Sequence, residues 1–342
     1  MGETDSRRTR MQIGFVGLGN MGTALANLVA ENGFDVLGWE INREVVDQVN
    51  REHRNDRFLP GIELHSRLQA TSDLGEVLSA SDVLFVAIPS VFIRKTLEPV
   101  AEKVRRSTVV VNLAKGIDAE TTMTAFQTLG VLFPENPRVM LSGPSIANEF
   151  ARGLPTVVVL AGERKETLAT VARLLDNNHF RTRFSDDAVG VELGGILKNI
   201  YAIGLGIFDG KGIRSVNFRS SYLTIALEEM TKIGAALGAK PHTFAYLAGM
   251  GDLLATSLSE HSHNRRMGVL LAEGHSLAEI RTKMGVLPEG YNTLKTALTI
   301  AEKFHVSASL AKCLWNVIHG RYEAEKFVYL FIRDFIEGED EG

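Results

Sequence analysis

A glycine-rich turn between a short strand and a helix, close to the start of the chain, constrains the fold more than any other feature. The run Ile13–Val16 reads as a strand, Gly17-Leu18-Gly19-Asn20-Met21-Gly22 follows it, and a helical pattern continues through Ala30. The first glycine permits a tight turn, the second lets the backbone approach a pyrophosphate, and the third lets the helix pack on the strand. The helix N-terminus adds partial positive charge. We therefore expect residues 17, 19, 20, 21 and 22 to bind a dinucleotide.

Residues 11–188 alternate short β-rich runs with helical stretches. This alternation predicts crossover units and a mainly parallel, doubly wound sheet, which is a Rossmann-type domain of the α/β class. The expected helical stretches include Met21–Asn32, Glu44–Arg51 and Ile93–Val104. The expected strands are Gln12–Val16, Val36–Trp39, Val83–Ala87, Val109–Leu113, Val139–Ser142, Thr156–Leu160 and Arg181–Phe184.

The second part of the chain changes to long helical patterns, and strand runs disappear. We expect an all-α domain over residues 189–336, opened by a long helix from about Val189. An amphipathic stripe in Phe327–Ile336 is interpreted as core or subunit packing rather than membrane contact. The other expected helices are Val191–Phe208, Phe218–Leu237, Pro241–Leu247, Asn264–Glu273, Ser276–Met284, Asn292–Phe304 and Ser309–His319.

The composition is that of a globular protein. Hydrophobic residues make up 45% of the 342 residues and charged residues 23%, and the net charge of −4 leaves no basic surplus for nucleic acid. The single cysteine, Cys313, forms no internal disulfide, which fits a reducing compartment, and is expected in the core. The start, Met1–Arg10, has no signal-peptide pattern, and no window holds the roughly 20 apolar residues that span a membrane. We expect a cytoplasmic protein without a membrane partner.

Polar and turn residues at other strand ends extend the predicted cofactor site. Glu40 follows the second strand, where a carboxylate accepts hydrogen bonds from the ribose hydroxyls and repels a 2′-phosphate, which favours NAD. The alternative is a solvated acid, and Arg43 lies close enough for a phosphate contact, so NADP stays possible. Pro89 and Lys115 follow two further strands, and ligands of open α/β sheets bind at such ends. For Lys115 a solvated loop lysine is the alternative.

Two segments in the middle of the chain carry a more specific pattern, Leu141-Ser142-Gly143-Pro144-Ser145 and Val191-Glu192-Leu193-Gly194-Gly195-Ile196-Leu197-Lys198-Asn199. With further segments they resemble the soluble NAD(P)-dependent glycerol-3-phosphate dehydrogenases, which interconvert dihydroxyacetone phosphate and sn-glycerol 3-phosphate. The resemblance covers the chain from Gln12 to about Arg333. The further segments are 235–239, 247–253, 264–266 and 288–290.

The resemblance implies roles for individual residues. Lys198 matches the catalytic lysine, which acts as general acid and base. The residues implied to bind substrate are Lys115, Gly143, Ser145, Asp252, Thr256, Ser262, His263 and Asn264. Those implied to bind cofactor, besides the glycine-rich turn and the strand-end residues Glu40 and Pro89, are Lys115, Ala147, Arg265 and Glu289.

The surroundings of Lys198 support its role independently. It lies among Gly194-Gly195-Ile196-Leu197 and Ile200-Tyr201-Ala202-Ile203, in an apolar helix that we expect to be buried. Burial of an ammonium favours release of its proton. A lysine placed so can hydrogen-bond a ketone oxygen and protonate it as hydride reaches the carbon, with Asp252 orienting the ammonium. The alternative is a lysine that reaches the surface or is paired structurally.

The chain departs from the family on the phosphate side of the site. His263 stands where the family usually has an arginine, and histidine offers no bidentate fork and is mostly uncharged at neutral pH. This replacement weakens the expected recognition of a phosphate. The arginines considered as compensation for this loss are Arg214, Arg265 and Arg266.

Further departures lie elsewhere in the chain. Ile225 occupies another position that is commonly arginine. The stretch 212–217 lacks the usual acid before its asparagine and is one residue longer. Glu40-Ile41 replaces a glycine and a frequent arginine or histidine, which removes a partner for a 2′-phosphate and favours NAD.

Three hypotheses follow from these residues. The leading one is NAD(P)H-dependent reduction of dihydroxyacetone phosphate to sn-glycerol 3-phosphate for glycerophospholipid synthesis, in a homodimer whose seam involves helices near Leu294–Leu314. The second is a paralogous NAD-dependent dehydrogenase acting on another small hydroxy or keto compound. The third is a non-catalytic dinucleotide sensor. No metal is expected, because His261, His263 and Cys313 share no ligand motif.

Overall fold

The structure is a computed structural model that describes residues 11–118, 121, 123–259 and 262–336. The expectations about Met1–Arg10 and about His261 lie outside the described residues. The chain divides into two compact units between Glu192 and Leu193. Each unit has a hydrophobic core of its own, and each is described by itself below.

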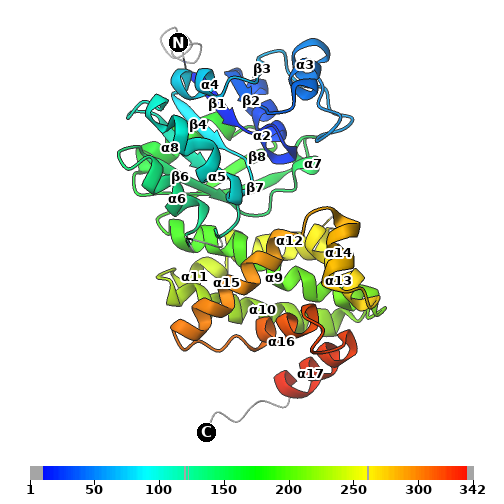
Figure 1. Ribbon diagram of the computed structural model, residues 1–342. Coiled ribbons are helices and arrows are strands. Elements are labelled where there is room, and N and C mark those ends of the chain that lie inside the picture. The colour runs from blue at the N-terminus through cyan, green and yellow to red at the C-terminus, as the bar shows by residue number, and fades with distance from the viewer. Residues whose placement is uncertain (1–10, 119–120, 122, 260–261, 337–342) are drawn as a thin grey trace. The chain divides into compact units, whose positions relative to one another are not determined.

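The first unit is built on a twisted sheet, drawn in blue to green in Figure 1. The described residues form eight strands in the order β3-β2-β1-β4-β5-β6-β7-β8. Every neighbouring pair is parallel except β6 and β7, which are antiparallel. The strands are β1 (Gln12–Val16), β2 (Asp35–Trp39), β3 (Leu68–Thr71), β4 (Val83–Val86), β5 (Val109–Asn112), β6 (Arg138–Ser142), β7 (Thr156–Ala161) and β8 (Phe180–Ser185).

The strand order changes direction between β1 and β4. From β1 the chain adds β2 and β3 on one side, and it then returns to add β4 to β8 on the other. Two loops therefore leave the carboxyl ends of β1 and β4 in opposite directions, which opens a crevice between them where doubly wound sheets bind ligands. The glycine-rich turn follows β1 at this position.

Helices cover both faces of the sheet and bury two separate hydrophobic clusters. One cluster joins α2 and α8 to the sheet through residues such as Leu25 and Val171, and the other joins α4, α5 and α6 through residues such as Val77 and Ile93. The doubly wound class is confirmed by this arrangement. The helices are α2 (Asn20–Glu31), α3 (Arg43–Glu52), α4 (Leu74–Ala80), α5 (Ser90–Leu97), η1 (Glu98–Lys103), α6 (Ala125–Leu132), α7 (Ala147–Phe150) and α8 (Lys165–Leu175).

The sequence analysis named neither strand β3 nor helix α4, and one expected helix is broken. Strand β3 (LQAT) has a single β-branched residue, and helix α4 is seven residues long, so neither gives a clear periodic signal. The expected helix Ile93–Val104 is wrong in part. The α-helix ends at Leu97 and continues as the tighter η1, because Pro99 stands in the first turn of η1 and offers no N–H for an α-helical bond.

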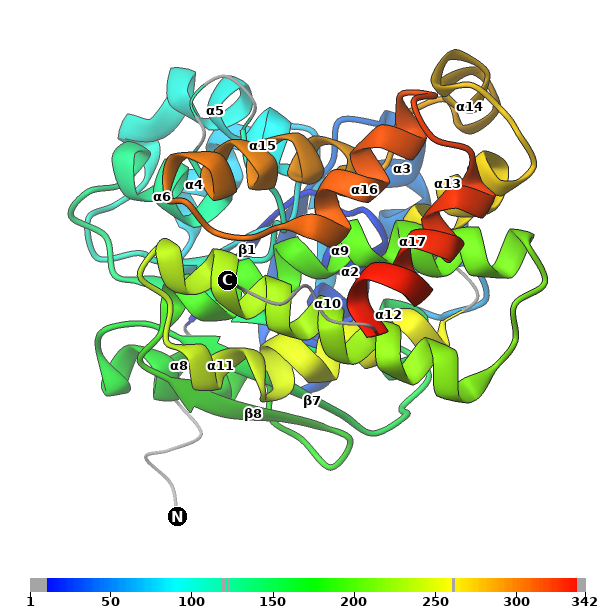
Figure 2. The same cartoon turned by 90° about the horizontal axis from the view of Figure 1, so that it is seen from below.

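The second unit is all-helical, and Figure 2 shows α10, α15, α16 and α17 from below. Its core includes Tyr201, Tyr222, Phe244 and Phe327. Leu294 and Leu314 are both fully buried in this core, and the dimer seam expected to involve helices near Leu294–Leu314 stays a prediction. The helices are α9 (Ala188–Gly210), α10 (Val216–Ala236), α11 (Pro241–Phe244), η2 (Leu247–Gly251), α12 (Asp252–Leu258), α13 (His263–Ala272), α14 (Leu277–Met284), α15 (Glu289–Lys303), α16 (Ser309–Ile318) and α17 (Ala324–Ile336).

The expected helix Pro241–Leu247 is also wrong in part, because the α-helix ends earlier than we expected. Helix α11 ends at Phe244, and a π-helical turn, η2, follows and leads directly into α12. In this turn the N–H of Gly251 donates to the carbonyl of Tyr246, 3.1 Å away. Gly249 permits the turn, because a Cβ there would lie 2.2 Å from the carbonyl oxygen of Phe244. Such π-turns are rare and are often found at functional sites.

Helix α9 is the central helix of the second unit. Among the described helices, α9 alone is long and apolar enough to cross a membrane by length and hydropathy. The sequence analysis had expected no such stretch. The apolar stretch of α9 is completely buried inside the protein. In α17 the expected apolar stripe packs inward through Phe327 and Phe331, while Tyr329 and Ile332 stay exposed. Cys313 is buried, as expected.

A buried carboxylate ties three helices of the second unit together. Glu229 of α10 accepts hydrogen bonds from the backbone N–H groups of Leu310 and Ala311 at the start of α16, each at 2.9 Å. It also accepts one from the hydroxyl of Tyr201 on α9, at 2.9 Å. Burial raises the pKa of Glu229, although these hydrogen bonds act in the opposite direction. The Glu229 carboxylate thus caps the N-terminus of α16, although it lies 81 residues before Leu310 in the sequence.

We expect Glu229→Ala to destabilise the protein by about 3 kcal/mol, because several buried donors lose their acceptor. Unfolding in urea measures this loss. The matched control is Glu228→Ala, which removes an exposed ion pair with Lys232 and should change the free energy of unfolding by less than about 0.5 kcal/mol. Equal effects of the two substitutions would contradict the role given to Glu229.

Candidate active site

The glycine-rich turn has the geometry that the sequence predicts. Gly17 has a φ of +100°, and a Cβ there would lie 2.7 Å from the Ile88 side chain. A Cβ on Gly22 would lie 2.0 Å from the carbonyl oxygen of Gly17, so the close approach of helix to turn requires glycine. Nothing lies within 4 Å of the corresponding position at Gly19. The turn is therefore tight on its protein side and open at Gly19.

The start of α2 and the buried Glu40 complete this part of the site. No side chain caps α2 at Gly19, so the first-turn N–H groups are available to an anion. Glu40 accepts hydrogen bonds from the N–H of Leu18 at 3.3 Å and of Asn42 at 3.0 Å. The acid thus holds the glycine-rich turn in place. Its predicted contact with a ribose stays a prediction.

Other predicted cofactor residues lie around the same turn. The amide of Asn20 donates to the carbonyl of Phe58 at 2.7 Å and to Asn148 Oδ1 at 2.9 Å. Asn148 belongs to α7, so this bond brings α7, which begins at Ala147, to the start of α2. Pro89 is exposed at the end of β4, immediately before α5. These features fit NAD or NADP at the switch point of the sheet.

The predicted substrate loops of the first unit follow β5 and β6. Gly143 has a φ of +120°, and the hydroxyl of Ser145 donates to its carbonyl at 3.1 Å. Asn112 ends β5 and holds both the N–H and the carbonyl of Ala114 at 3.1 Å. Lys115, the next residue, is half-buried. Local hydrogen bonds therefore hold each of the two loops.

Glu192 is a buried acid to which the sequence analysis gave no role. It accepts hydrogen bonds from the N–H of Phe126 at 2.8 Å and from the Asn112 amide at 3.4 Å. Burial raises the pKa of Glu192 to about 7, against hydrogen bonds with Thr124 and Phe126 that lower it. Glu192 therefore connects the first turn of α9 to the strand end that precedes Lys115.

Lys198 lies in the second unit with two polar partners. Its Nζ donates to Asp252 Oδ1 at 2.6 Å and to the hydroxyl of Thr256 at 2.7 Å, and both Lys198 and Asp252 are buried. Asp252 directly follows the η2 turn, and Gly194 allows that turn to lie against α9, because a Cβ there would meet the Ala248 carbonyl at 2.5 Å. The structure brings the predicted lysine, aspartate and threonine together.

A second polar group lies one residue further along α9. Asn199 Oδ1 accepts from the amide of Asn264 at 3.1 Å, and Asn264 Oδ1 accepts from the N–H of Gly290 at 3.0 Å. Gly290 follows Glu289, the predicted cofactor residue at the start of α15. The chain of amides fixes Asn264 and the start of α15 to the helix that carries Lys198.

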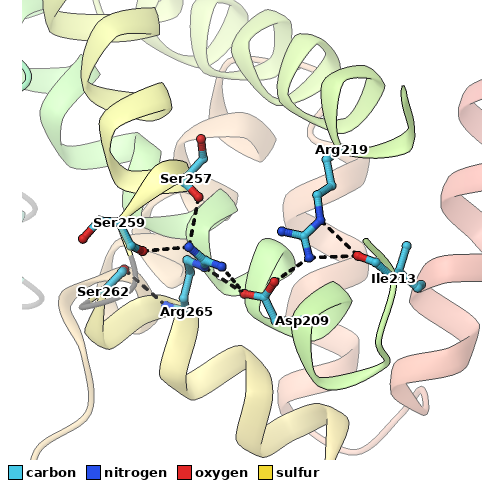
Figure 3. A network of polar contacts seen from close by, with 7 residues as sticks. All are labelled: Asp209, Ile213, Arg219, Ser257, Ser259, Ser262 and Arg265. Carbon is cyan, nitrogen blue, oxygen red and sulfur yellow. Dashed lines mark hydrogen bonds and ion pairs between the residues drawn. The ribbon is translucent and has the colours of Figure 1, made fainter. Parts of the chain in front are cut away.

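The residues at the start of α13 differ in their surroundings. Ser262 caps the helix by accepting from the N–H of Arg265, and His263 is exposed. The guanidinium of Arg265 is engaged by Asp209 and by two backbone carbonyls, as Figure 3 shows. The contact of Arg265 with a cofactor stays a prediction. The other arginines considered as compensation for His263, Arg214 and Arg266, are exposed.

Sequence reasoning missed three polar residues of these surroundings, Asn112, Glu192 and Asp209. Glu192 had a signal, because it interrupts the apolar face of the motif that contains Lys198. Asn112 also stood in view, at the end of an apolar strand run. Asp209 had none, because its partners lie far away in sequence. An uncapped helix after a glycine turn, at the switch point of a doubly wound sheet, is the arrangement of a dinucleotide-binding protein.

Comparison with known proteins gives the family. Residues 12–168 match the model of the NAD-dependent glycerol-3-phosphate dehydrogenase N-terminus, and residues 187–329 match that of its C-terminus. The chain belongs to the NAD-dependent glycerol-3-phosphate dehydrogenase family. The resemblance noted in the sequence is thereby confirmed.

Curated relatives and a solved structure agree. A glycerol-3-phosphate dehydrogenase (NAD(P)+) of Geobacter sulfurreducens is 40% identical over 327 residues, 94% of this chain and 97% of that protein. One of Bacillus velezensis is 36% identical over 320 residues, 93% of this chain and 92% of that protein. The crystal structure of glycerol-3-phosphate dehydrogenase from Coxiella burnetii matches with a TM-score of 0.88 at 29% identity, covering 95% of this chain and 99% of that one.

We expect Glu192→Gln to change how stability depends on pH. Because the raised pKa means that the folded state holds the proton more tightly than the unfolded one, the parent loses stability as the pH rises from about 4.5 to about 7. A shift of this size corresponds to about 3 kcal/mol. Melting temperatures of both proteins at pH 5 and pH 8 measure the difference. A gap between parent and variant that is the same at both values would contradict this assignment.

Proposed function

We propose that the protein reduces dihydroxyacetone phosphate to sn-glycerol 3-phosphate with NADH or NADPH, in a reversible reaction. The observation that carries this proposal is the buried Lys198 ammonium, held by Asp252 and Thr256 in a chain of the glycerol-3-phosphate dehydrogenase family. A ketone needs a proton at its oxygen when hydride reaches its carbon, and Lys198 is the donor that this chain offers.

The chemistry assigned to the chain's own residues is proton transfer. When bound, the reduced nicotinamide supplies the hydride that the carbonyl carbon receives. Lys198 Nζ donates a hydrogen bond to the carbonyl oxygen and gives up its proton as negative charge develops there. Asp252 and the Thr256 hydroxyl hold Nζ in place through their hydrogen bonds. In the reverse direction the neutral amine takes the proton from the hydroxyl of glycerol 3-phosphate.

The binding roles are divided between two domains in this proposal. Residues 11–188 bind the dinucleotide, and residues 189–336 provide most of the substrate site. The proposed cofactor contacts are Gly17, Gly19, Asn20, Met21, Gly22, Glu40, Pro89, Lys115, Ala147, Arg265 and Glu289. The proposed substrate contacts are Lys115, Gly143, Ser145, Asp252, Thr256, Ser262, His263 and Asn264.

Three observations bear on the choice of substrate, on the choice between an enzyme and a sensor, and on the choice of cofactor. The curated relatives share the name glycerol-3-phosphate dehydrogenase, which favours dihydroxyacetone phosphate over another small hydroxy or keto compound despite His263. The Lys198–Asp252 pair argues for an enzyme rather than a dinucleotide sensor. Glu40, buried at the end of β2, favours NAD, since a carboxylate there repels a 2′-phosphate.

We further propose a homodimer in the cytoplasm, without a membrane or nucleic-acid partner, whose product enters glycerophospholipid synthesis. The net charge of −4 supports the absence of nucleic acid. Tyr329 and Ile332, exposed on α17, are apolar surface that a second copy could cover.

We expect Lys198→Ala to lower kcat for dihydroxyacetone phosphate by about 10²–10⁴-fold, the usual contribution of positioned proton transfer. NADH oxidation followed at 340 nm measures the rate, with NADPH compared in parallel. Lys232→Ala, which removes a half-exposed lysine of α10, is the control and should leave the rate unchanged. A Lys198→Ala protein that retains the parent's kcat would refute the assigned role.

A further inference from the structure

Asp209, close to the end of α9, lies between two arginines from different parts of the second unit, as Figure 3 shows. Its Oδ2 accepts from the Nε and Nη2 of Arg265, and its Oδ1 accepts from the Nη2 of Arg219. All three side chains are mostly buried, with exposed fractions of 16% for Arg265, 22% for Asp209 and 23% for Arg219. Pairs of this kind are stronger than those on open surface.

The other terminal nitrogen of the Arg265 guanidinium binds the backbone that precedes α13. Its Nη1 donates to the carbonyl of Ser257 at 2.9 Å and to that of Ser259 at 2.7 Å. Its own N–H is held by the Ser262 hydroxyl at 3.3 Å. The guanidinium therefore holds the backbone at the end of α12 and links it to the start of α13. Asp209 in turn holds the guanidinium.

The backbone of α9 is shaped to receive this group. A Cβ on Gly206 would lie 2.0 Å from the carbonyl oxygen of Arg265, and a Cβ on Gly268 would lie 2.0 Å from that of Ile203. Both glycines let α13 lie directly against α9. The close contact with Gly206 of α9 therefore fixes the backbone position of Arg265. Gly206 lies about one helical turn before Asp209 on the same helix.

The segments that Arg265 fixes carry proposed substrate residues at both ends. Thr256, which accepts from Lys198 Nζ, directly precedes Ser257. Ser262, His263 and Asn264 are the three residues before Arg265. We therefore expect a change in the direction of the guanidinium to displace the proposed substrate residues that precede Ser257 and Arg265, whereas neither Lys198 nor Asp252 lies in those segments.

Arg219 has a different task. Its Nε and Nη2 donate to the carbonyl of Ile213, at 3.0 Å and 2.8 Å, and so hold the connection between α9 and α10. None of the proposed substrate residues lies in that connection. The two arginines therefore share one carboxylate but hold different segments of the chain.

We propose that Asp209 is a positioning residue, which acts through Arg265 to set the Ser257–Ser259 and Ser262–Asn264 segments for binding of the phosphorylated ketone. The inference rests on the proposed function. The partners of Arg265, which are Asp209 and two backbone carbonyls, fit this positioning role. His263, which stands where the family usually has an arginine on the phosphate side, is exposed.

The experiment compares steady-state kinetics of the full-length parent, Asp209→Asn and Asp209→Glu with dihydroxyacetone phosphate and NADH. We expect Asp209→Asn to raise the KM for the ketone about tenfold, with kcat within about twofold, because a small misplacement of contacts weakens substrate binding. Asp209→Glu, which keeps the charge, should recover part of the loss. Arg265→Lys, which keeps charge without the fork, should resemble Asp209→Asn.

The matched control is Arg219→Ala, which removes the other partner of the same carboxylate. It should leave the KM for the ketone within about twofold of the parent. An equal rise in KM for Arg219→Ala, or a parental KM for both Asp209→Asn and Arg265→Lys, would overturn the proposal. If Asp209→Asn fails to fold, Asp209→Glu and Arg265→Lys decide by the same criterion. A parent without activity on the ketone would refute the proposed function instead.

Discussion

The site of the second unit depends on the pairing of a buried ammonium with a buried carboxylate. Lys198 and Asp252 are 2.6 Å apart, and neither side chain is more than 11% exposed. Removing two charges from water is costly, and their attraction offsets that cost only with good geometry and further hydrogen bonds. The hydroxyl of Thr256 supplies one such bond. These two partners hold the Lys198 ammonium in one orientation. Proton transfer to a ketone oxygen requires such a fixed donor.

The rest of the second unit fixes this geometry through close backbone contacts. Gly194 lets the π-helical turn approach α9, and Asp252 follows that turn directly. The amides of Asn199 and Asn264 link the same helix to the starts of α13 and α15. Asp209 then holds Arg265 near the end of α9. One buried helix therefore sets the positions of the proposed catalytic and binding residues of this unit.

Much of the fold was predictable because its signals are local. The glycine-rich turn, most strands and most helices follow from periodicity and from residues close in sequence, whereas β3, α4 and the break at Pro99 gave weak signals. The Lys198–Asp252 pair followed from the resemblance. The pairing of Asp209 with Arg265 and of Glu192 with Phe126 joins residues 56 and 66 positions apart, and no local pattern reports such a contact.

The central claim is that Lys198 protonates the substrate oxygen. A crystal structure of the protein with dihydroxyacetone phosphate and an unreactive dinucleotide tests it most directly. We expect Lys198 Nζ to lie within about 2.6–3.2 Å of the carbonyl oxygen, with Asp252 still as its partner. A carbonyl oxygen that is held by other groups, with Nζ bound only to Asp252 and Thr256, would contradict it.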